Sequence, residues 1–161
     1  MTIGSHQSGV GKSQVHLTPR WILDSLGPFD LDPCAATVRP FDCAARNIIE
    51  AEDGLAANWG GRVWLNPPFD RYQVGRWIER LAQHGDGIAL IHARTETAWF
   101  RPIWQRASSL LFMFDRVKFL RPDGTSQSSN SGAPVALVAF GDANSRVLNN
   151  CAIAGARVDE W

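Results

Sequence analysis

An apolar segment that ends against two consecutive prolines constrains this chain more than any other stretch. Val63, Trp64 and Leu65 have the composition of a buried β-strand, and Asn66-Pro67-Pro68-Phe69 follows directly. Neither proline can donate to a strand ladder, and each favours an extended conformation in the residue before it. The strand therefore stops at Asn66 and continues as a stiff loop. In open α/β sheets, ligands bind at this carboxyl end of the strands.

Asn66 and Phe69 place a side-chain amide and an aromatic face at this loop. An amide acceptor, a rigid backbone carbonyl and a ring are suited to holding a planar base that carries an amino group. The alternative is an ordinary turn, because Asn-Pro-Pro occurs in many loops without chemistry. The rest of the chain has to decide between these two interpretations.

Composition places the chain among soluble globular proteins of one domain. Its 161 residues are 45% hydrophobic and 20% charged, and 16 basic residues balance 16 acidic ones. A nucleic-acid contact would therefore depend on a local patch rather than on an overall basic field. Three cysteines without metal-ligand spacing are typical of reduced thiols in a cytoplasmic protein. We expect neither a membrane span nor a signal peptide.

Residues 1–15 are polar and rich in glycine and serine, which predicts a flexible segment before a single domain at 16–161. Within that segment, Gly9-Val10-Gly11-Lys12-Ser13 resembles the end of a phosphate-binding loop. The motif requires a glycine at the position of His6 and a preceding strand, and the sequence has neither. We therefore expect no phosphate-binding loop here.

A helix and a short strand precede the Asn-Pro-Pro loop. Thr18 is a predicted helix cap, Pro19 suits the first helical position, and Gly27-Pro28 predicts the helix end. The strand runs from Phe29 to Pro33 and leads into small residues, Cys34, Ala35 and Ala36. Small residues there let a nucleotide-like ligand approach the backbone, but a plain strand-to-loop turn fits equally well.

A short predicted strand at 47–49 is followed by three carboxylates, Glu50, Glu52 and Asp53. Such a cluster is usually a solvated turn. One carboxylate beside the strand that ends at Asn66 could instead accept a hydrogen bond from a ligand's amine or ribose. Asp53 is the candidate, because Gly54 permits a sharp turn that directs it inward.

Beyond Phe69, predicted strands and helices alternate. Helices are predicted at 74–83 and from Trp99 to Trp104, and strands at 87–93, 109–114 and 134–140, with a polar loop at 116–132. Strands separated by helices predict an α/β domain with a mainly parallel sheet flanked by helices.

Several of these segments, taken in order, resemble the phage-type Dam DNA N6-adenine methyltransferases. The likeness covers roughly residues 13 to 141, and protein glutamine methyltransferases share its Asn-Pro-Pro-Phe motif. The matching segments are Thr18-Pro19, Phe29 to Ala36, Asp53-Gly54-Leu55, Trp64 to Phe69, Ala93 to Phe100 and Gly132-Ala133-Pro134.

The resemblance implies a reduced Rossmann-like methyltransferase fold that binds S-adenosylmethionine and methylates N6 of adenine in double-stranded DNA, with no metal. The resemblance assigns catalysis to Asn66, Pro67, Pro68 and Phe69, with Phe69 as the stacking platform for a flipped base. It assigns the cofactor to Thr18, Pro19, Asp32, Pro33, Cys34, Ala35 and Asp53. Two departures stand out: His16 replaces an expected tryptophan, and the link from Asp32 to Asn66 is too short for the usual second and third strands.

The candidate DNA contacts are basic residues near the motif and in the later loop. An ordinary solvated surface is the alternative reading of the same charges. Two rival classes also remain open, a protein or small-molecule N-methyltransferase and a non-catalytic DNA-binding relative. We further expect a cytoplasmic monomer of bacterial, phage or prophage origin. The basic candidates are Arg71, Arg76, Arg94, Arg116, Lys118 and Arg121.

Overall fold

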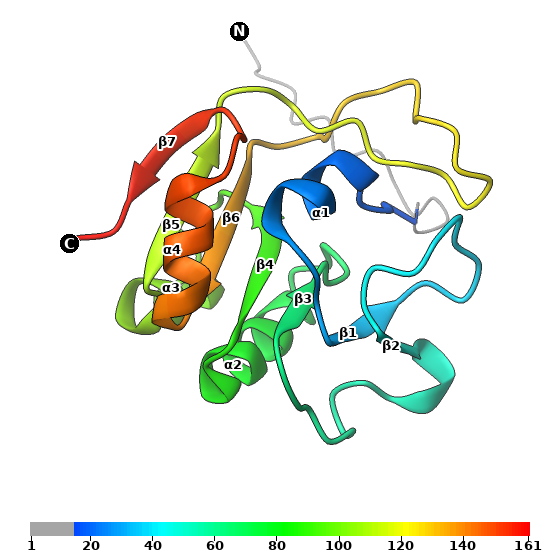
Figure 1. Ribbon diagram of the computed structural model, residues 1–161, viewed down its shortest axis with the longest axis horizontal. Coiled ribbons are helices and arrows are strands. Elements are labelled where there is room, and N and C mark those ends of the chain that lie inside the picture. The colour runs from blue at the N-terminus through cyan, green and yellow to red at the C-terminus, as the bar shows by residue number, and fades with distance from the viewer. Residues whose placement is uncertain (1–14) are drawn as a thin grey trace, which may run out of the picture.

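Seven strands and four α-helices alternate along residues 15–161, which are the residues that the computed structural model describes. The segment predicted at 1–15, apart from Val15, and the glycine-rich stretch at 9–13 lie outside the described residues. In chain order (Figure 1) the elements are α1 (Arg20–Leu26), β1 (Leu31–Ala35), β2 (Arg46–Ile49), the 3-10 turn η1 (Glu50–Glu52), β3 (Val63–Leu65), α2 (Val74–His84), β4 (Gly87–His92), the 3-10 turn η2 (Ala98–Phe100), α3 (Arg101–Arg106), β5 (Ser109–Met113), β6 (Val135–Phe140), α4 (Asp142–Asn150) and β7 (Gly155–Val158).

The strands form one mixed sheet in the order β2-β1-β3-β4-β6-β5-β7. Strands β2, β1, β3 and β4 pair in parallel, whereas β6 is antiparallel to both β4 and β5, and β7 is antiparallel to β5. The parallel arrangement predicted from the sequence therefore holds for one half of the sheet, strands β2, β1, β3 and β4. This half contains the strand that precedes Asn66. The other half is antiparallel.

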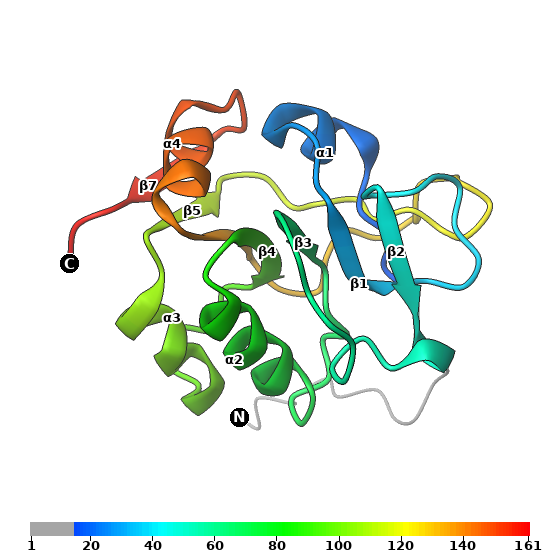
Figure 2. The same cartoon turned by 60° about the horizontal axis from the view of Figure 1, so that its bottom comes forward.

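Helices cover both faces of this sheet, as Figure 2 shows with α1 and α4 above it and α2 and α3 below it. The β-strands alternate their side chains between the two layers, so that Trp64 belongs to the core under α1 and α4. Val63 and Leu65 belong to the core over α2 and α3. No helix among residues 15–161 is long and apolar enough to cross a membrane.

Two local predictions near the site are wrong in detail. Thr18 does not cap α1, because the residue before the helix is Pro19 and no side chain bonds the first turn. The first strand also continues through Pro33 to Ala35 instead of ending there. Proline has no N–H for the ladder, and the pairing of β1 with β2 is irregular between Asp32 and Ala35.

Candidate active site

Four parallel strands end side by side at one edge of the sheet. The residues that follow them are Ala36 after β1, Glu50 after β2, Asn66 after β3 and Ala93 after β4. Because the strands are neighbours in the order β2-β1-β3-β4, their loops form one continuous rim. This rim holds Asn66 and Glu50, which directly follow β3 and β2.

The side-chain amide of Asn66 is held by both of its N–H groups. Its Nδ2 donates to the carbonyl oxygen of His16 at 2.7 Å and to the hydroxyl of Thr18 at 3.2 Å. These two acceptors fix the orientation of the amide, because a flipped amide would set its oxygen against two oxygens. Among residues 15–161, no group of the chain donates to Oδ1, which remains available as an acceptor at the rim.

Phe69 lies within a group of four rings. It stacks on His92 with ring centroids 4.0 Å apart and an interplanar angle of 21°. Phe119 and His16 contact the same ring at tilted angles, with centroids 5.7 and 5.8 Å away. The sequence predicted Phe69 as a platform open to a base. In the structure one face of the ring is already covered by His92.

Both histidines of this group are kept neutral by their surroundings. Burial, followed by the nearby Arg94, His16 and Arg116, lowers the pKa of His92 to about 4. Burial also lowers the pKa of His16. At neutral pH the rings beside Phe69 are therefore uncharged aromatic surfaces.

A small cavity opens beside Asn66, near the start of α1. Its lining combines a carboxylate, a hydroxyl, two thiols and two aromatic rings. The Nε1 of Trp64, a side chain with no exposed surface, has no hydrogen-bond partner among the described residues. The lining residues are Leu17, Thr18, Asp32, Cys34, Ala36, Arg39, Pro40, Phe41, Cys43, Trp64 and Asn66.

Asp32 is the buried acid of this cavity and is only 4% exposed. Burial raises its pKa to about 6, although its Oδ1 accepts a hydrogen bond from the backbone N–H of Cys34 at 3.0 Å. Burial and the nearby carboxylate raise the pKa values of Cys34 and Cys43 to about 12. The thiols therefore stay protonated, and Asp32 is the group whose charge changes near neutral pH.

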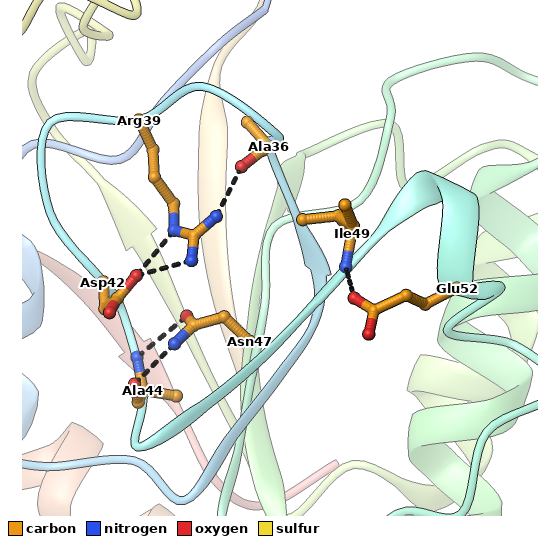
Figure 3. Close-up of polar contacts among 7 residues, drawn as sticks. All are labelled: Ala36, Arg39, Asp42, Ala44, Asn47, Ile49 and Glu52. Atoms are coloured by element: carbon orange, nitrogen blue, oxygen red, sulfur yellow. Dashed lines mark hydrogen bonds and ion pairs between the residues drawn. The ribbon is translucent and has the colours of Figure 1, made fainter.

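The β1–β2 connection forms one wall of the cavity and is held by hydrogen bonds and an ion pair among its own residues (Figure 3). Arg39 pairs with Asp42 at 2.6 Å and donates to the carbonyl of Ala36 at 2.9 Å. Asn47 closes the loop through the backbone of Ala44, with Nδ2 to carbonyl oxygen at 2.7 Å. The wall is thus built before any ligand arrives.

Asp53 does not point inward as predicted. Its side chain is exposed, its own backbone adopts a left-handed φ of 51°, and its Oδ1 accepts from the N–H of Ala56 at 3.3 Å. Gly54 has a different role from the predicted one: a Cβ there would lie 1.8 Å from the carbonyl oxygen of Pro33. This close approach brings the turn against the end of β1. Glu50, directly after β2, is a second acid at the same rim.

A second small cavity is lined by Phe69. Its walls are aromatic, and two exposed arginines, Arg71 and Arg94, stand at its edge. Guanidinium groups around an aromatic hollow suit a ligand that combines a planar ring with phosphates. The lining residues are Phe69, Arg71, Val74, His92, Arg94 and Trp99.

The segment 114–134 between β5 and β6 covers part of the rim. It was predicted as a polar loop with little core, but Val117 and Phe119 are each 1% exposed and pack into the sheet core. Leu120 pairs with Leu17 and with Ser126 in antiparallel bridges. Side chains therefore alternate between core and solvent here, and Lys118 between the two buried residues faces solvent.

The comparison with known families agrees with this geometry. The family model described as DNA N-6-adenine-methyltransferase (Dam) matches residues 10–148. The chain belongs to this family. No curated protein and no solved structure matches it. The Dam resemblance read from the sequence over residues 13–141 is thus confirmed, with a slightly longer extent.

Seven of the fifteen predicted site residues line one of the two cavities. Thr18, Asp32, Cys34 and Asn66 line the first cavity, and Phe69, Arg71 and Arg94 line the second. The other eight line neither cavity: Pro19, Pro33, Ala35, Asp53, Pro67, Pro68, Lys118 and Arg121. The sequence analysis missed His92, Trp99, Phe41 and Cys43. His92 alone left a signal, because it ends a continuous apolar strand at the same edge as Asn66.

Proposed function

We propose that this Dam family member transfers a methyl group from S-adenosylmethionine to the N6 amine of adenine in double-stranded DNA. One observation carries the proposal: the Asn66 amide is held through its nitrogen, and its oxygen has no donor among residues 15–161. An amino group on a planar base is a matching donor.

The residues of the rim would act on N6 by orienting it. Adenine N6 is a weak nucleophile because its lone pair is delocalised into the ring. Hydrogen bonds from N6 to Oδ1 of Asn66 and to the carbonyl of Pro67 would steer the nitrogen towards tetrahedral geometry, which localises the lone pair on N6 for attack on the methyl group. The same two oxygens stabilise the positive charge that develops on N6, and the Asn66 amide is already oriented before the reaction.

The first cavity fits the amino-acid end of the cofactor. Asp32 offers a carboxylate to an ammonium group, and the buried Nε1 of Trp64 is an unpaired donor for an oxygen. Phe41 and Pro40 offer apolar surface to a purine. When bound, the cofactor supplies a methyl group activated by a positively charged sulfur. The fold also supports this reading, since only one strand, β2, comes between β1 and β3 along the chain, as expected for a reduced Rossmann-like methyltransferase sheet.

The second cavity is the proposed site of the flipped base. N6 cannot be reached inside a duplex, so the target adenine must leave the stack. Phe69, His92 and Trp99 give the base aromatic walls, and the two neutral histidines add no charge against a purine. Arg71 and Arg94 at the edge are placed to contact the flanking phosphates.

The proposal is tested with unmethylated plasmid DNA and isotopically labelled S-adenosylmethionine, followed by nucleoside analysis. N6-methyladenine is the expected product, and N4-methylcytosine, or label found only in proteins of a host lysate, would contradict it. Asn66→Ala should lower kcat by about a hundredfold, because one preorganised acceptor is worth about 3 kcal/mol. Cofactor binding measured by calorimetry should persist. Asn58→Ala, an exposed asparagine that lines neither cavity, is the matched control.

A further inference from the structure

We propose that Tyr72 enters the duplex beside the target adenine and stacks in the space that the flipped base leaves. This inference rests on the proposed function and assigns a DNA-contacting role to a residue outside both the Asn-Pro-Pro-Phe motif and the two cavities. Its starting point is exposure: 73% of the Tyr72 side chain is accessible to solvent, three residues after Phe69.

The turn that carries Tyr72 is rigid. Oδ1 of Asp70 accepts the backbone N–H of Tyr72 at 2.7 Å, and the carbonyl of Asp70 accepts the N–H groups of Gln73 and Val74 at 3.1 and 2.9 Å. This turn joins Phe69 to the first residue of α2 without a flexible link. The backbone of Tyr72 is therefore fixed next to Arg71, which lines the base cavity, and its side chain is exposed.

The surroundings of the ring suit nucleic acid. The guanidinium of Arg71 lies over the ring, 4.6 Å from its centroid, and donates a hydrogen bond to the tyrosine hydroxyl. Arg71 also lines the second cavity together with Arg94. An aromatic face with cations around it combines the two features that bind stacked bases and their phosphates.

Exposure alone does not select Tyr72, because Phe114 is also 73% exposed, and Trp21 and Trp161 are about half exposed. Position selects it. The neighbours of Tyr72 in the chain line the base cavity, whereas Trp21 lies on α1 and Trp161 packs against Trp104 through a hydrogen bond of 2.7 Å. Phe114 lies directly after β5, away from the parallel half of the sheet.

Extruding a base costs unstacking and unpairing energy, and a side chain that fills the gap returns part of that cost. Base–aromatic stacking is worth about 1–3 kcal/mol, which corresponds to roughly fivefold to 150-fold in an equilibrium constant. A stack of this kind matters only when the target base must be removed from a pair. This dependence separates insertion into the duplex from a structural role of Tyr72.

The experiment compares two duplexes that contain an adenine already mapped as a methylation target of the wild-type protein. In one duplex this adenine pairs with thymine, and in the other it faces an abasic site. Tyr72→Ala should lower kcat/KM about tenfold to a hundredfold on the paired duplex. The loss should be within about threefold when the adenine is unpaired, because little flipping cost remains. Tyr72→Phe retains the ring and should restore most of the rate on paired DNA.

Trp161→Ala is the control at an exposed aromatic residue outside the segment 114–134, and it should match wild type on both duplexes. An equal loss on the two duplexes for Tyr72→Ala, or full activity on paired DNA, would overturn the inference. A paired-specific loss in Trp161→Ala instead would transfer the insertion to that residue and overturn it as well. Absence of N6-methyladenine with the wild-type protein would refute the proposed function itself, so the two failures are distinguishable.

Discussion

The clamp on Asn66 depends on individual atoms that lie far from it in the chain. One of its two acceptors is the buried hydroxyl of Thr18, 3.2 Å from Nδ2. Thr18→Val removes that acceptor and leaves the bond to the His16 carbonyl. The amide should become less well oriented, and kcat at saturating cofactor should fall about fivefold, in line with roughly 1 kcal/mol for a hydrogen bond.

Because Thr18 also lines the first cavity, cofactor affinity has to be measured separately. A double variant distinguishes the two roles. If Thr18 acts through Asn66, Thr18→Val should change kcat little in a chain that already carries Asn66→Ala. Additive losses would show that Thr18 acts on catalysis by another route.

Asp32 links the first cavity to the pH dependence of stability. Its pKa is about 6 in the folded chain against an ordinary value of 3.8, so the folded state binds the proton more tightly than the unfolded state. The contribution of Asp32 to the free energy of unfolding therefore falls as pH rises from about 4 to about 6, and then stays constant. The full difference is about 3 kcal/mol.

Asp32→Asn should consequently raise the free energy of unfolding at pH 8 by up to about 3 kcal/mol, with the gain vanishing below about pH 4. His92 titrates in the opposite sense, since its lowered pKa costs stability as pH falls from about 6.5 to about 4. Denaturant melts give the free energy of unfolding of wild type and variant at each pH. The difference between the two isolates the contribution of Asp32. Asp24→Asn on the exposed face of α1 is the control. A gain that does not depend on pH would contradict the assignment.

The sequence could reveal a site residue when the features that mark it lie close to it in the chain. Asn66 and Phe69 were predicted because prolines beside a strand are a local signal. The groups that hold them were not: His16 lies 50 positions before Asn66, and His92 lies 23 positions after Phe69. No periodicity or spacing marks such pairs. Asp53 failed for a related reason, because the backbone conformation of a turn, rather than its composition, decides where a carboxylate points.

At the scale of elements, the segment 114–134 combines a structural and a binding surface. Val117 and Phe119 are buried, whereas Lys118 between them faces solvent. Arg121 is used internally, since its Nη1 donates to the carbonyl of Ser126 at 2.7 Å and to Thr125 at 3.3 Å. A Cβ on Gly124 would lie 3.2 Å from Pro40, so the tip of the segment reaches the wall of the first cavity.

The two basic residues should therefore behave differently. Lys118→Ala should reduce the slope of log affinity for DNA against log salt by about 0.9 and leave the melting temperature unchanged. Arg121→Ala should lower the stability of the segment by roughly 1 kcal/mol through the lost hydrogen bonds. Salt titrations and thermal melts of both variants check this. An unchanged slope in Lys118→Ala would place the DNA surface elsewhere, with Arg71 and Arg94 as the next candidates.

The elements that the sequence revealed are those with strong apolar patterns. Helix α2 and strand β4 lie where they were expected, because their buried faces are regular. Helix α4 and strand β7 were missed. The buried residues of α4 are Asn144 and Leu148. Because one of the two is polar, the sequence of α4 shows no hydrophobic periodicity. Edge strand β7 has no fully buried residue.

At the scale of the whole molecule, the two edges of the sheet have separate tasks. The carboxyl edge holds Asn66 and the two cavities. The opposite edge is closed by Asn144 of α4, which has no exposed surface and links three elements. Its Oδ1 accepts from Nε of Arg62 at 2.6 Å, and its Nδ2 donates to Asp86 at 2.7 Å and to the carbonyl of Phe140 at 2.9 Å.

This hydrogen-bond network predicts a variant with lower stability and unchanged activity. Asn144→Ala would leave Arg62 and Asp86 without their shared partner, although Arg62 keeps its place over the Phe29 ring at 4.2 Å. Breaking a buried hydrogen bond to a charged group costs about 1.5–3 kcal/mol, so the free energy of unfolding should fall by at least that amount. Asn150→Ala, on the exposed part of the same helix, should have an effect within about 0.5 kcal/mol. Below its melting temperature, the Asn144 variant should keep wild-type kcat and cofactor affinity, because the whole sheet separates this edge from the rim. A loss of kcat without a loss of stability would show that the two edges are coupled through β3 and β4.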